Sequence, residues 1–436
     1  MTQTQTQTQT RTQIAQPELV PEVAPAAGAL PPAAPEELGL DPDRLEQLFA
    51  LIEGHIAAGR YPGAQVAVAR HGRLAACRTF GRAQVDPDVA ATDATLWLLY
   101  SQTKMLVSAT LWQLVDRGAL SFSDLVADHL PEFAAKGKGE ITVHQLLSHQ
   151  AGFPNARPGP EVWTDHELLR RTVCDFALEW KPGTKVQYHG ASAHWVAAVL
   201  IEALSGRDYR QVVRQDLLDP LGLGDLFVGV PAPAQGRCAD MHVLRVSEGE
   251  ERPVALDEAR SAAFRAAGVP GGGGYGTAAA LAAFYQMLAA GGALNGRRVL
   301  SPRVIAHATR NHTGDRVDDN TGATMNRGLG PVVRGLVPPH AAQYAPGQSR
   351  GMGTIAPPQT FGHGGAGSSF SWADPEAGLS FSYLSNCRAE DPFHSRRLDR
   401  LSNLVHAALV QPLAQPGRRR GPAGGPPETG RRGAQR

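Results

Sequence analysis

The sequence predicts a mixed α/β fold of the α+β kind, in which an antiparallel sheet flanked by helices is interrupted by a large, mainly helical insertion. Three observations support this prediction. A β-hairpin pattern over 64–69 and 74–77 lies near the start of the chain. Residues of about 101–290 have mostly helical periodicity, with Gly and Pro between the segments. Alternating patterns return in 368–374 and 379–384, so the first and last segments are expected to meet in one sheet.

The elements can be justified in chain order. Residues 41–58 have the apolar spacing of a helix and open with Asp41-Pro42, a capping side chain followed by a residue that favours the first turn. His71-Gly72 supplies the turn between the two hairpin strands. A long apolar helix is expected to begin near Ser101, and further helices are expected over 142–149, 191–204 and 394–410.

Composition indicates one large domain between two tails. The chain has 436 residues, of which 42% are hydrophobic and 19% charged, and we expect the folded domain to span 37–414. Residues 1–36 begin with a Thr-Gln repeat and continue rich in Pro and Ala, whereas 415–436 are rich in Gly, Pro and Arg. Both tails are expected to be disordered, because they cannot bury enough apolar surface to offset the entropy lost on ordering.

The same numbers exclude several classes of function. A formal net charge of +1 gives no basic field that would attract nucleic acid. The four cysteines have no Cys-x-x-Cys spacing, so we expect neither a zinc site nor a redox pair. No apolar run is long enough to span a membrane, and the N-terminus lacks the apolar block of a secretory signal, so we expect a cytoplasmic protein without a membrane partner.

Ser101 and Lys104 form the most informative pattern, since they lie three positions apart where the apolar helix begins. Residues at this spacing share a helix face, so the Lys104 amine can reach the Ser101 hydroxyl and make it a nucleophile. A pattern of two residues at this spacing occurs often by chance. Other segments of the chain support a catalytic role for Ser101 and Lys104. These are Pro62-Gly63-Ala64, the stretch 141–152, Tyr188-His189-Gly190, Asn295-Gly296-Arg297-Arg298, and the stretch 362–367 that reads Gly-His-Gly-Gly-Ala-Gly.

Together these segments resemble the serine β-lactamase and penicillin-binding protein superfamily, and within it the class C-like branch of esterases and acyltransferases, over 38–413. The resemblance implies a β-lactamase/transpeptidase-like fold. It also implies that Ser101 is the nucleophile and that Lys104 and Tyr188 jointly take its proton and return it to the leaving group. A phenol with a pKa of about 10 can act as a base only beside a cation, which Lys104 would supply. Whether Lys104 or Tyr188 is the general base stays open.

The resemblance assigns the rest of the site to the stretch 363–366. The backbone N–H groups of Ser101 and Ala366 would form the oxyanion hole. Gly364 and Gly365 would let the strand edge approach the substrate, and His363 would line the site and hydrogen-bond the substrate or Tyr188. No cofactor and no metal ion are implied.

Two departures from the β-lactamase pattern favour esters as substrates. His363 replaces the lysine that would hold the carboxylate of a penicillin, and Gly190 replaces an asparagine that would contact the acylamide of the drug. The sequence therefore predicts a serine hydrolase that cleaves small-molecule carboxylic esters through an acyl-enzyme. The alternatives are an acyltransferase acting on a small metabolite, a β-lactamase or D-amino peptidase, and a non-catalytic binding protein. The expected partner is a small ester or acyl substrate, and the oligomeric state is not predicted.

A competing nucleophile is Ser349, because 347–351 read Gly-Gln-Ser-Arg-Gly and match the nucleophile elbow of α/β hydrolases. That motif requires a strand before it and a helix after it. Prolines and glycines on both sides prevent these elements. We therefore expect Ser349 to lie in a loop near the mouth of the site.

Overall fold

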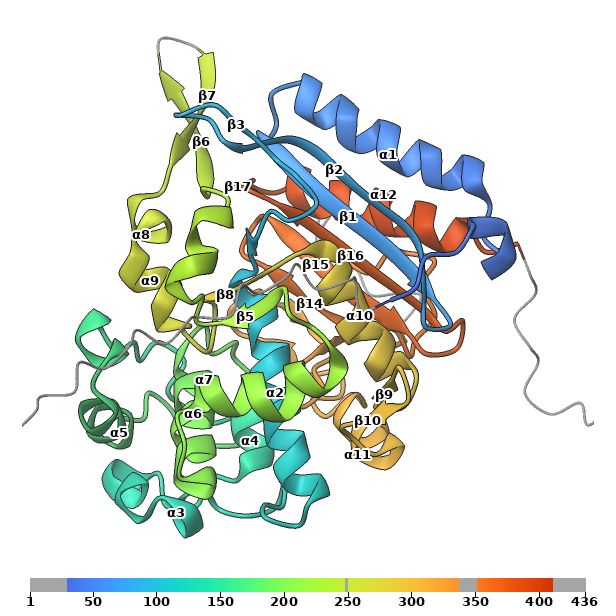
Figure 1. The fold of residues 1–436 in the computed structure, drawn as a ribbon. Helices are drawn as coiled ribbons and strands as arrows, with labels where there is room; N and C mark the ends of the chain where they lie inside the picture. The colour runs from blue at the N-terminus through green and yellow to red at the C-terminus, as the bar shows by residue number, and fades with distance from the viewer. Residues whose placement is uncertain (1–29, 248–249, 337–350, 411–436) are drawn as a thin grey trace, which may run out of the picture.

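The computed structural model describes residues 30–247, 250–336 and 351–410. Its centre is a seven-stranded antiparallel sheet, which confirms the predicted fold class (Figure 1). In sheet order its strands are β13 (Val332–Val333), β14 (Phe361–Gly365), β15 (Ser369–Asp374), β16 (Leu379–Ser385), β1 (Gly63–Arg70), β2 (Arg73–Gln84) and β3 (Val89–Ala90). The pairing of β1 with β16 joins the two ends of the fold, as the sequence predicts.

Helices cover both faces of this sheet because its central strands are apolar on both sides. Val66 and Val68 of β1 pack under α1 (Pro42–Ala57) and α12 (Phe393–Ala407). Ala67 and Ala69 point to the opposite face, against α10 (Ala278–Ala289). The predicted helix over 41–58 is thus confirmed, and the Asp41 side chain caps it by accepting from the Asp43 backbone N–H at 2.9 Å.

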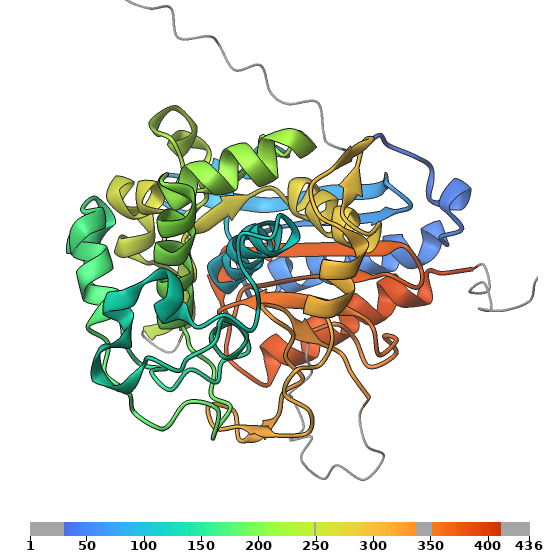
Figure 2. The same cartoon turned by 90° about the horizontal axis from the view of Figure 1, so that it is seen from below.

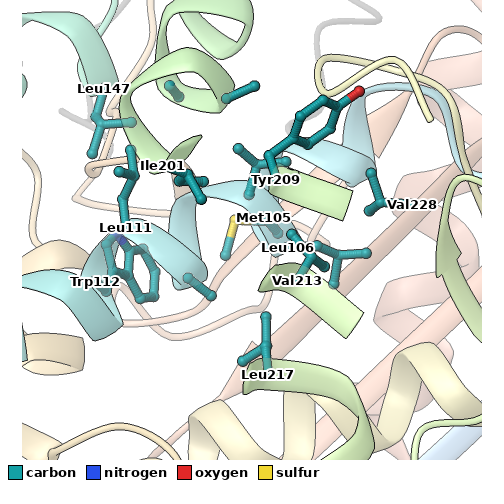
Figure 3. Close-up of a cluster of buried hydrophobic side chains, with 14 of the residues drawn as sticks. Met105, Leu106, Leu111, Trp112, Leu147, Ile201, Tyr209, Val213, Leu217 and Val228 are labelled. Carbon is teal, nitrogen blue, oxygen red and sulfur yellow. The ribbon is translucent and has the colours of Figure 1, made fainter. Parts of the chain in front are cut away.

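A second, mainly helical region lies beside the sheet and contains α2 (Thr103–Asp116), as Figure 2 shows from below. Apolar residues surround α2 on all sides, and a helix of this kind has to be buried. Figure 3 shows its Met105, Leu106, Leu111 and Trp112 packed among side chains of other elements. The remaining helices of this region are α3 (Val126–His129), α4 (Val143–Leu147), α5 (His166–Cys174), α6 (Ser192–Ser205), α7 (Tyr209–Val212), α8 (Asp257–Arg260) and α9 (Ala262–Ala267), and α11 (Pro302–Ala308) follows the region.

Several short strands that the sequence patterns did not predict lie within or beside the insertion. One small sheet joins β4 (Trp97–Leu98), β8 (Gly274–Gly276) and β5 (Leu226–Val228), and another joins β17 (Cys387–Arg388), β6 (His242–Ser247) and β7 (Glu250–Ala255). Two short hairpins are formed by β9 (Ala293–Leu294) with β10 (Arg297–Arg298) and by β11 (Val317–Asp318) with β12 (Ala323–Thr324). In the described part of the chain, no helix is long and apolar enough to cross a membrane.

The described residues begin inside the segment that was expected to be a disordered tail. Leu30 is buried, Pro32 forms a β-bridge with Leu74, and Pro35–Leu38 form a 3-10 helix. The difference has a physical reason, because Leu30 and Leu38 bury their side chains in the core of the domain. The expected tails over 1–29 and 415–436, and Ser349, lie outside the described residues.

Candidate active site

Ser101 lies in a strained turn that leads into α2. Tyr100, the residue before it, has a φ of 47°, in the left-handed region that residues other than glycine rarely adopt. A 3-10 turn over Tyr100–Gln102 then joins α2. The Thr103 hydroxyl fixes this turn, because it donates to the Tyr100 carbonyl at 2.6 Å and accepts from the Gly274 backbone N–H at 2.8 Å. The turn therefore presents Ser101 at the start of the helix.

The amine of Lys104 contacts the hydroxyl of Ser101, as the spacing predicts. The Lys104 Nζ donates to the Ser101 Oγ at 3.0 Å, to the Gly190 carbonyl at 2.8 Å and to the Gly271 carbonyl at 2.6 Å. Lys104 is fully buried, and all three acceptors are uncharged. The glycine run 271–274 thus lines this site and supplies one of its acceptors.

The environment of Lys104 favours its neutral form. Burial is the largest cause and lowers the pKa of Lys104 below its usual value. The positive charges of Arg327 and Arg157 lower that pKa further, whereas the interaction with Tyr188 raises it. A lysine whose pKa is lowered in this way has a larger fraction of free amine near neutral pH, and a free amine can accept the proton of a neighbouring hydroxyl.

Tyr188 lies in the loop before α6, with its ring among basic side chains. The Lys104 Nζ is 5.1 Å from the centroid of the ring, and the guanidinium carbon of Arg327 is 4.9 Å from it. The rings of His149 and His363 lie 4.8 and 6.3 Å away, measured between centroids. The structure therefore brings Ser101, Lys104, Tyr188 and His363 together, with the Arg327 guanidinium and the Lys104 amine beside the ring of Tyr188.

A buried ion pair behind Tyr188 was not predicted from the sequence. Arg327 donates to the Asp318 Oδ2 through Nε at 3.0 Å and also through a terminal nitrogen, and both side chains are at least 95% buried. The other oxygen of Asp318 accepts from the backbone N–H of Tyr188 at 3.2 Å. The pair thus holds the loop that carries Tyr188. No signal in the sequence could have found it, because a single Asp and a single Arg in a stretch rich in polar residues match no motif.

His363 lies on β14 and presents a hydrogen-bond acceptor to the site. Its Nδ1 is 2.8 Å from the Gly364 carbonyl, which only accepts, so Nδ1 carries the proton and Nε2 has a free lone pair. Among the described residues, this buried Nε2 has no partner. Burial is the largest cause that lowers the pKa of His363 to about 3, and the charge of Lys104 adds to it. His363 is therefore neutral at pH 7, whereas an exposed lysine would carry a positive charge at this pH.

Gly365 allows β14 to lie directly against the turn that carries Ser101. A Cβ at this residue would lie 2.5 Å from the Leu99 carbonyl oxygen and 2.4 Å from the Ser369 Oγ. At Gly364 a Cβ would meet the ring of Phe370 at 3.0 Å. Ala366 follows immediately at the end of the strand. The close approach places the end of β14 and the start of α2 next to each other, which is the arrangement that a shared oxyanion hole requires.

A cluster of possible metal ligands lies elsewhere and is filled by an arginine. Within the described ranges, His166, Glu202 and Asp208 have ligand atoms close enough to hold a metal ion. Arg210 donates to Asp208 at 2.6 Å and contacts the Nε2 of His166 at 3.0 Å. A permanent cation in this position satisfies the carboxylate and repels a metal ion.

Comparisons with known proteins identify the family of this chain. The family model described as Beta-lactamase matches residues 48–405. The Esterase/beta-lactamase LipL of Mycobacterium tuberculosis is 28% identical over 341 residues, which cover 72% of each chain. A family VIII carboxylesterase has a similar crystal structure, with a TM-score of 0.72 and 29% identity over 85% of this chain and 99% of that one. A penicillin-binding protein homologue from Caulobacter crescentus gives the same TM-score, identity and coverage.

Proposed function

Because this chain belongs to the beta-lactamase family and is a serine hydrolase, we propose that it cleaves small-molecule carboxylic esters through an acyl-enzyme on Ser101. The observation that carries the proposal is the contact of 3.0 Å between the Ser101 Oγ and the buried Nζ of Lys104. An uncharged amine at this distance can remove the hydroxyl proton as the oxygen attacks.

The proposed reaction has two halves. The Ser101 oxygen forms a bond with the ester carbonyl carbon while its proton passes to Lys104 and Tyr188, and the resulting oxyanion accepts hydrogen bonds from the backbone N–H groups of Ser101 and Ala366. The bond to the alcohol then breaks, and the alkoxide takes the proton from the Lys104–Tyr188 pair. Water attacks the acyl-enzyme by the same route, and its proton passes through the pair to Ser101. The products are a carboxylic acid and an alcohol.

The choice of esters over β-lactams is supported by the groups that surround the nucleophile. His363 is neutral at pH 7 and cannot hold a carboxylate as a lysine would. Gly190 offers its carbonyl to Lys104 and has no side-chain amide for an acylamide. The name of the family VIII carboxylesterase agrees with this choice, whereas the name of LipL includes both activities.

The test is the mass of the intact protein after brief exposure to para-nitrophenyl butyrate. We expect the wild-type chain to gain one butyryl group, Ser101→Ala to gain none, and Ser349→Ala to behave as the wild type. We also expect kcat/KM for this ester to exceed that for a chromogenic cephalosporin by about a hundredfold or more, since the groups that would hold the β-lactam are missing. Acylation that persists in Ser101→Ala would overturn the assigned nucleophile. A cephalosporin turned over as fast as the best ester would replace the proposal with a β-lactamase.

A further inference from the structure

Arg157 reaches the position that Gly190 leaves open. A Cβ added to Gly190 would lie 3.7 Å from a terminal nitrogen of the Arg157 guanidinium. The carbonyl of the same glycine accepts from the Lys104 Nζ at 2.8 Å, and this Nζ is 3.0 Å from the Ser101 Oγ. The guanidinium is thus separated from the nucleophile by one glycine and one lysine side chain.

The loop that carries Arg157 is fixed to the wall of the site. Phe153, four residues earlier, donates its backbone N–H to the His189 Nε2 at 3.2 Å. Its carbonyl accepts from the Ser192 hydroxyl at 2.8 Å. These two bonds hold the loop beside Tyr188 and Gly190. The backbone that leads to Arg157 is therefore held in place beside the site.

The carboxylates near Arg157 in the chain are engaged elsewhere. Glu179 accepts from the backbone and the side chain of Asn155 at 2.9 and 2.7 Å. Glu161 turns back to the backbone N–H of Gly159 at 3.2 Å. Among the residues that the structure describes, Arg157 has no ion pair and no hydrogen bond, and its side chain is exposed. Its charge is available to a ligand.

The other charges beside the site do not neutralise Arg157. The carboxylate behind Tyr188 belongs to Asp318, and Arg327 already holds it in a buried pair. Lys104 donates to a hydroxyl and two carbonyls and faces no carboxylate. Among the described side chains beside Gly190, the Arg157 guanidinium therefore carries a positive charge that no carboxylate neutralises.

We propose that Arg157 forms an anion-binding subsite and that the substrates are esters that carry a carboxylate. This inference rests on the proposed ester hydrolysis and narrows its substrate class. A guanidinium has a planar fork of donors that matches a carboxylate with two parallel, charge-assisted hydrogen bonds. The charge would bind one end of the substrate while Ser101 attacks the ester at the other.

The experiment compares matched esters that differ by one charge. For the acyl half, the para-nitrophenyl half-ester of glutaric acid is compared with para-nitrophenyl pentanoate, which has the same chain length. For the alcohol half, para-carboxyphenyl butyrate is compared with its neutral carboxamide analogue. Both pairs are measured as kcat/KM with wild-type protein, Arg157→Gln, Arg157→Lys and Arg157→Glu, and Arg44→Gln serves as the control for an exposed arginine on α1, whose side chain contacts Gln47.

We expect the wild type to prefer the charged member of one pair, which identifies the half of the substrate that carries the anion. Arg157→Gln should lower the ratio of kcat/KM for that member to kcat/KM for its neutral partner by about tenfold or more, and because both members depend equally on the pKa of Lys104, this ratio is independent of the effect of Arg157 on that pKa. Arg157→Lys should retain part of the preference, since it keeps the charge but not the fork, and Arg157→Glu should reverse it. Arg44→Gln should change nothing.

Gly190→Asn offers an independent check, because an amide side chain would occupy the space beside the guanidinium. We expect it to remove the preference for the charged ester, and we expect Arg157→Gln to add no further loss in that background. A wild-type enzyme without charge preference in either pair would overturn the anion subsite, and so would an equal loss on charged and neutral esters in Arg157→Gln. If no ester of either pair acylates Ser101, the proposed function itself fails.

Discussion

Arg327 and Asp318 are buried residues of opposite charge beside Tyr188, and we expect both charges to affect the pKa of Lys104. The positive charge of Arg327 is one of the causes that lower the pKa of Lys104, and Asp318 balances this charge from 3.0 Å away. The environment of Lys104 thus makes its amine a better proton acceptor than an ordinary lysine, without a catalytic carboxylate. The two members of the pair should affect that acceptor in opposite directions.

Arg327→Gln and Asp318→Asn provide a test of this electrostatic role. If free Lys104 amine is needed, kcat/KM rises with pH as the amine loses its proton. Arg327→Gln removes a charge that lowers the pKa of Lys104, so the rise should move to higher pH. Asp318→Asn leaves Arg327 unbalanced, so the rise should move to lower pH. The measurement is the pH profile of kcat/KM for a neutral ester, with thermal unfolding as a check on folding, because an unpaired buried charge destabilises the chain. Shifts in the same direction, or none, would reduce the pair to a structural role.

The candidate site residues could be predicted from the sequence only where a short local motif contains them. Ser101 and Lys104 share one helix start, and their contact follows from their spacing. Asp318, Arg327 and Arg157 could not be predicted in this way, because they reach the site from separate loops and their partners are set by tertiary packing alone. The position of Ser101 in a 3-10 turn, after a residue with positive φ, also has no local signal.

At the scale of elements, β14 can lie directly against the turn before α2 because Gly365 has no side chain. A Cβ on Gly365 would lie 2.5 Å from the carbonyl oxygen of Leu99, and the Gln102 amide of the same turn donates to the hydroxyl of Ser369 on β15 at 2.8 Å. The distance between strand and turn is therefore set by glycine. The oxyanion site that we propose depends on that distance.

Gly365→Ala should separate these two elements. Its methyl group would lie 2.5 Å from a backbone oxygen, which cannot move like the end of a side chain. We expect kcat to fall by about a hundredfold, because a donor of the oxyanion hole would be displaced, while KM changes less. Gly364→Ala is the matched comparison, since its methyl group would meet the ring of Phe370 at 3.0 Å and this ring can shift. The larger loss should belong to Gly365→Ala, and equal losses would contradict the assigned contact.

The elements differ in how well the sequence predicts them. Helix α2 and strands β1, β15 and β16 follow from the pattern of their apolar residues, whereas only residues 74–77 of the longer strand β2 were predicted. Strand β8 reads Gly-Tyr-Gly and has no strand propensity of its own, and it forms because β4 and β5 pair with it on both sides. Strands of this kind depend on pairing across the chain, which a local pattern does not contain.

At the scale of the whole molecule, buried histidines should make the fold sensitive to acid. Burial is the largest cause that lowers the pKa of His363 and His394 to about 3 and that of His189 and His406 to about 4, from the usual 6.5. Between pH 6.5 and 4 the unfolded chain therefore binds protons at these histidines and the folded chain does not. Stability is complete above pH 6.5 and is lost as the pH falls, by up to roughly 1.4 kcal/mol per pH unit for each histidine.

We expect the midpoint of thermal unfolding to fall by about 10 °C or more between pH 7 and pH 5. His406→Phe should flatten this dependence. A phenyl ring can keep the stacking on Trp372, where the ring centroids are 4.3 Å apart, and it has no group that binds a proton. Calorimetry or circular dichroism at several pH values provides the measurement. An unfolding midpoint that is constant from pH 7 to pH 5 would mean that these histidines are charged without cost in the folded chain.

The central sheet also fixes the order in which the protein can be assembled during synthesis. Strand β1 pairs with β16, and the Gly63 backbone N–H bonds to the Asn386 side chain, 323 positions later. When β1 leaves the ribosome, its neighbour on that side has not yet been translated, and the valines of its apolar face have no cover from α12. The helices around α2 contact one another over shorter stretches of chain and can pack earlier. Ser101 and Lys104 can therefore be in place while β14, the strand that completes their site, is still being synthesised. We thus expect the growing chain to be inactive until its last strands have been added.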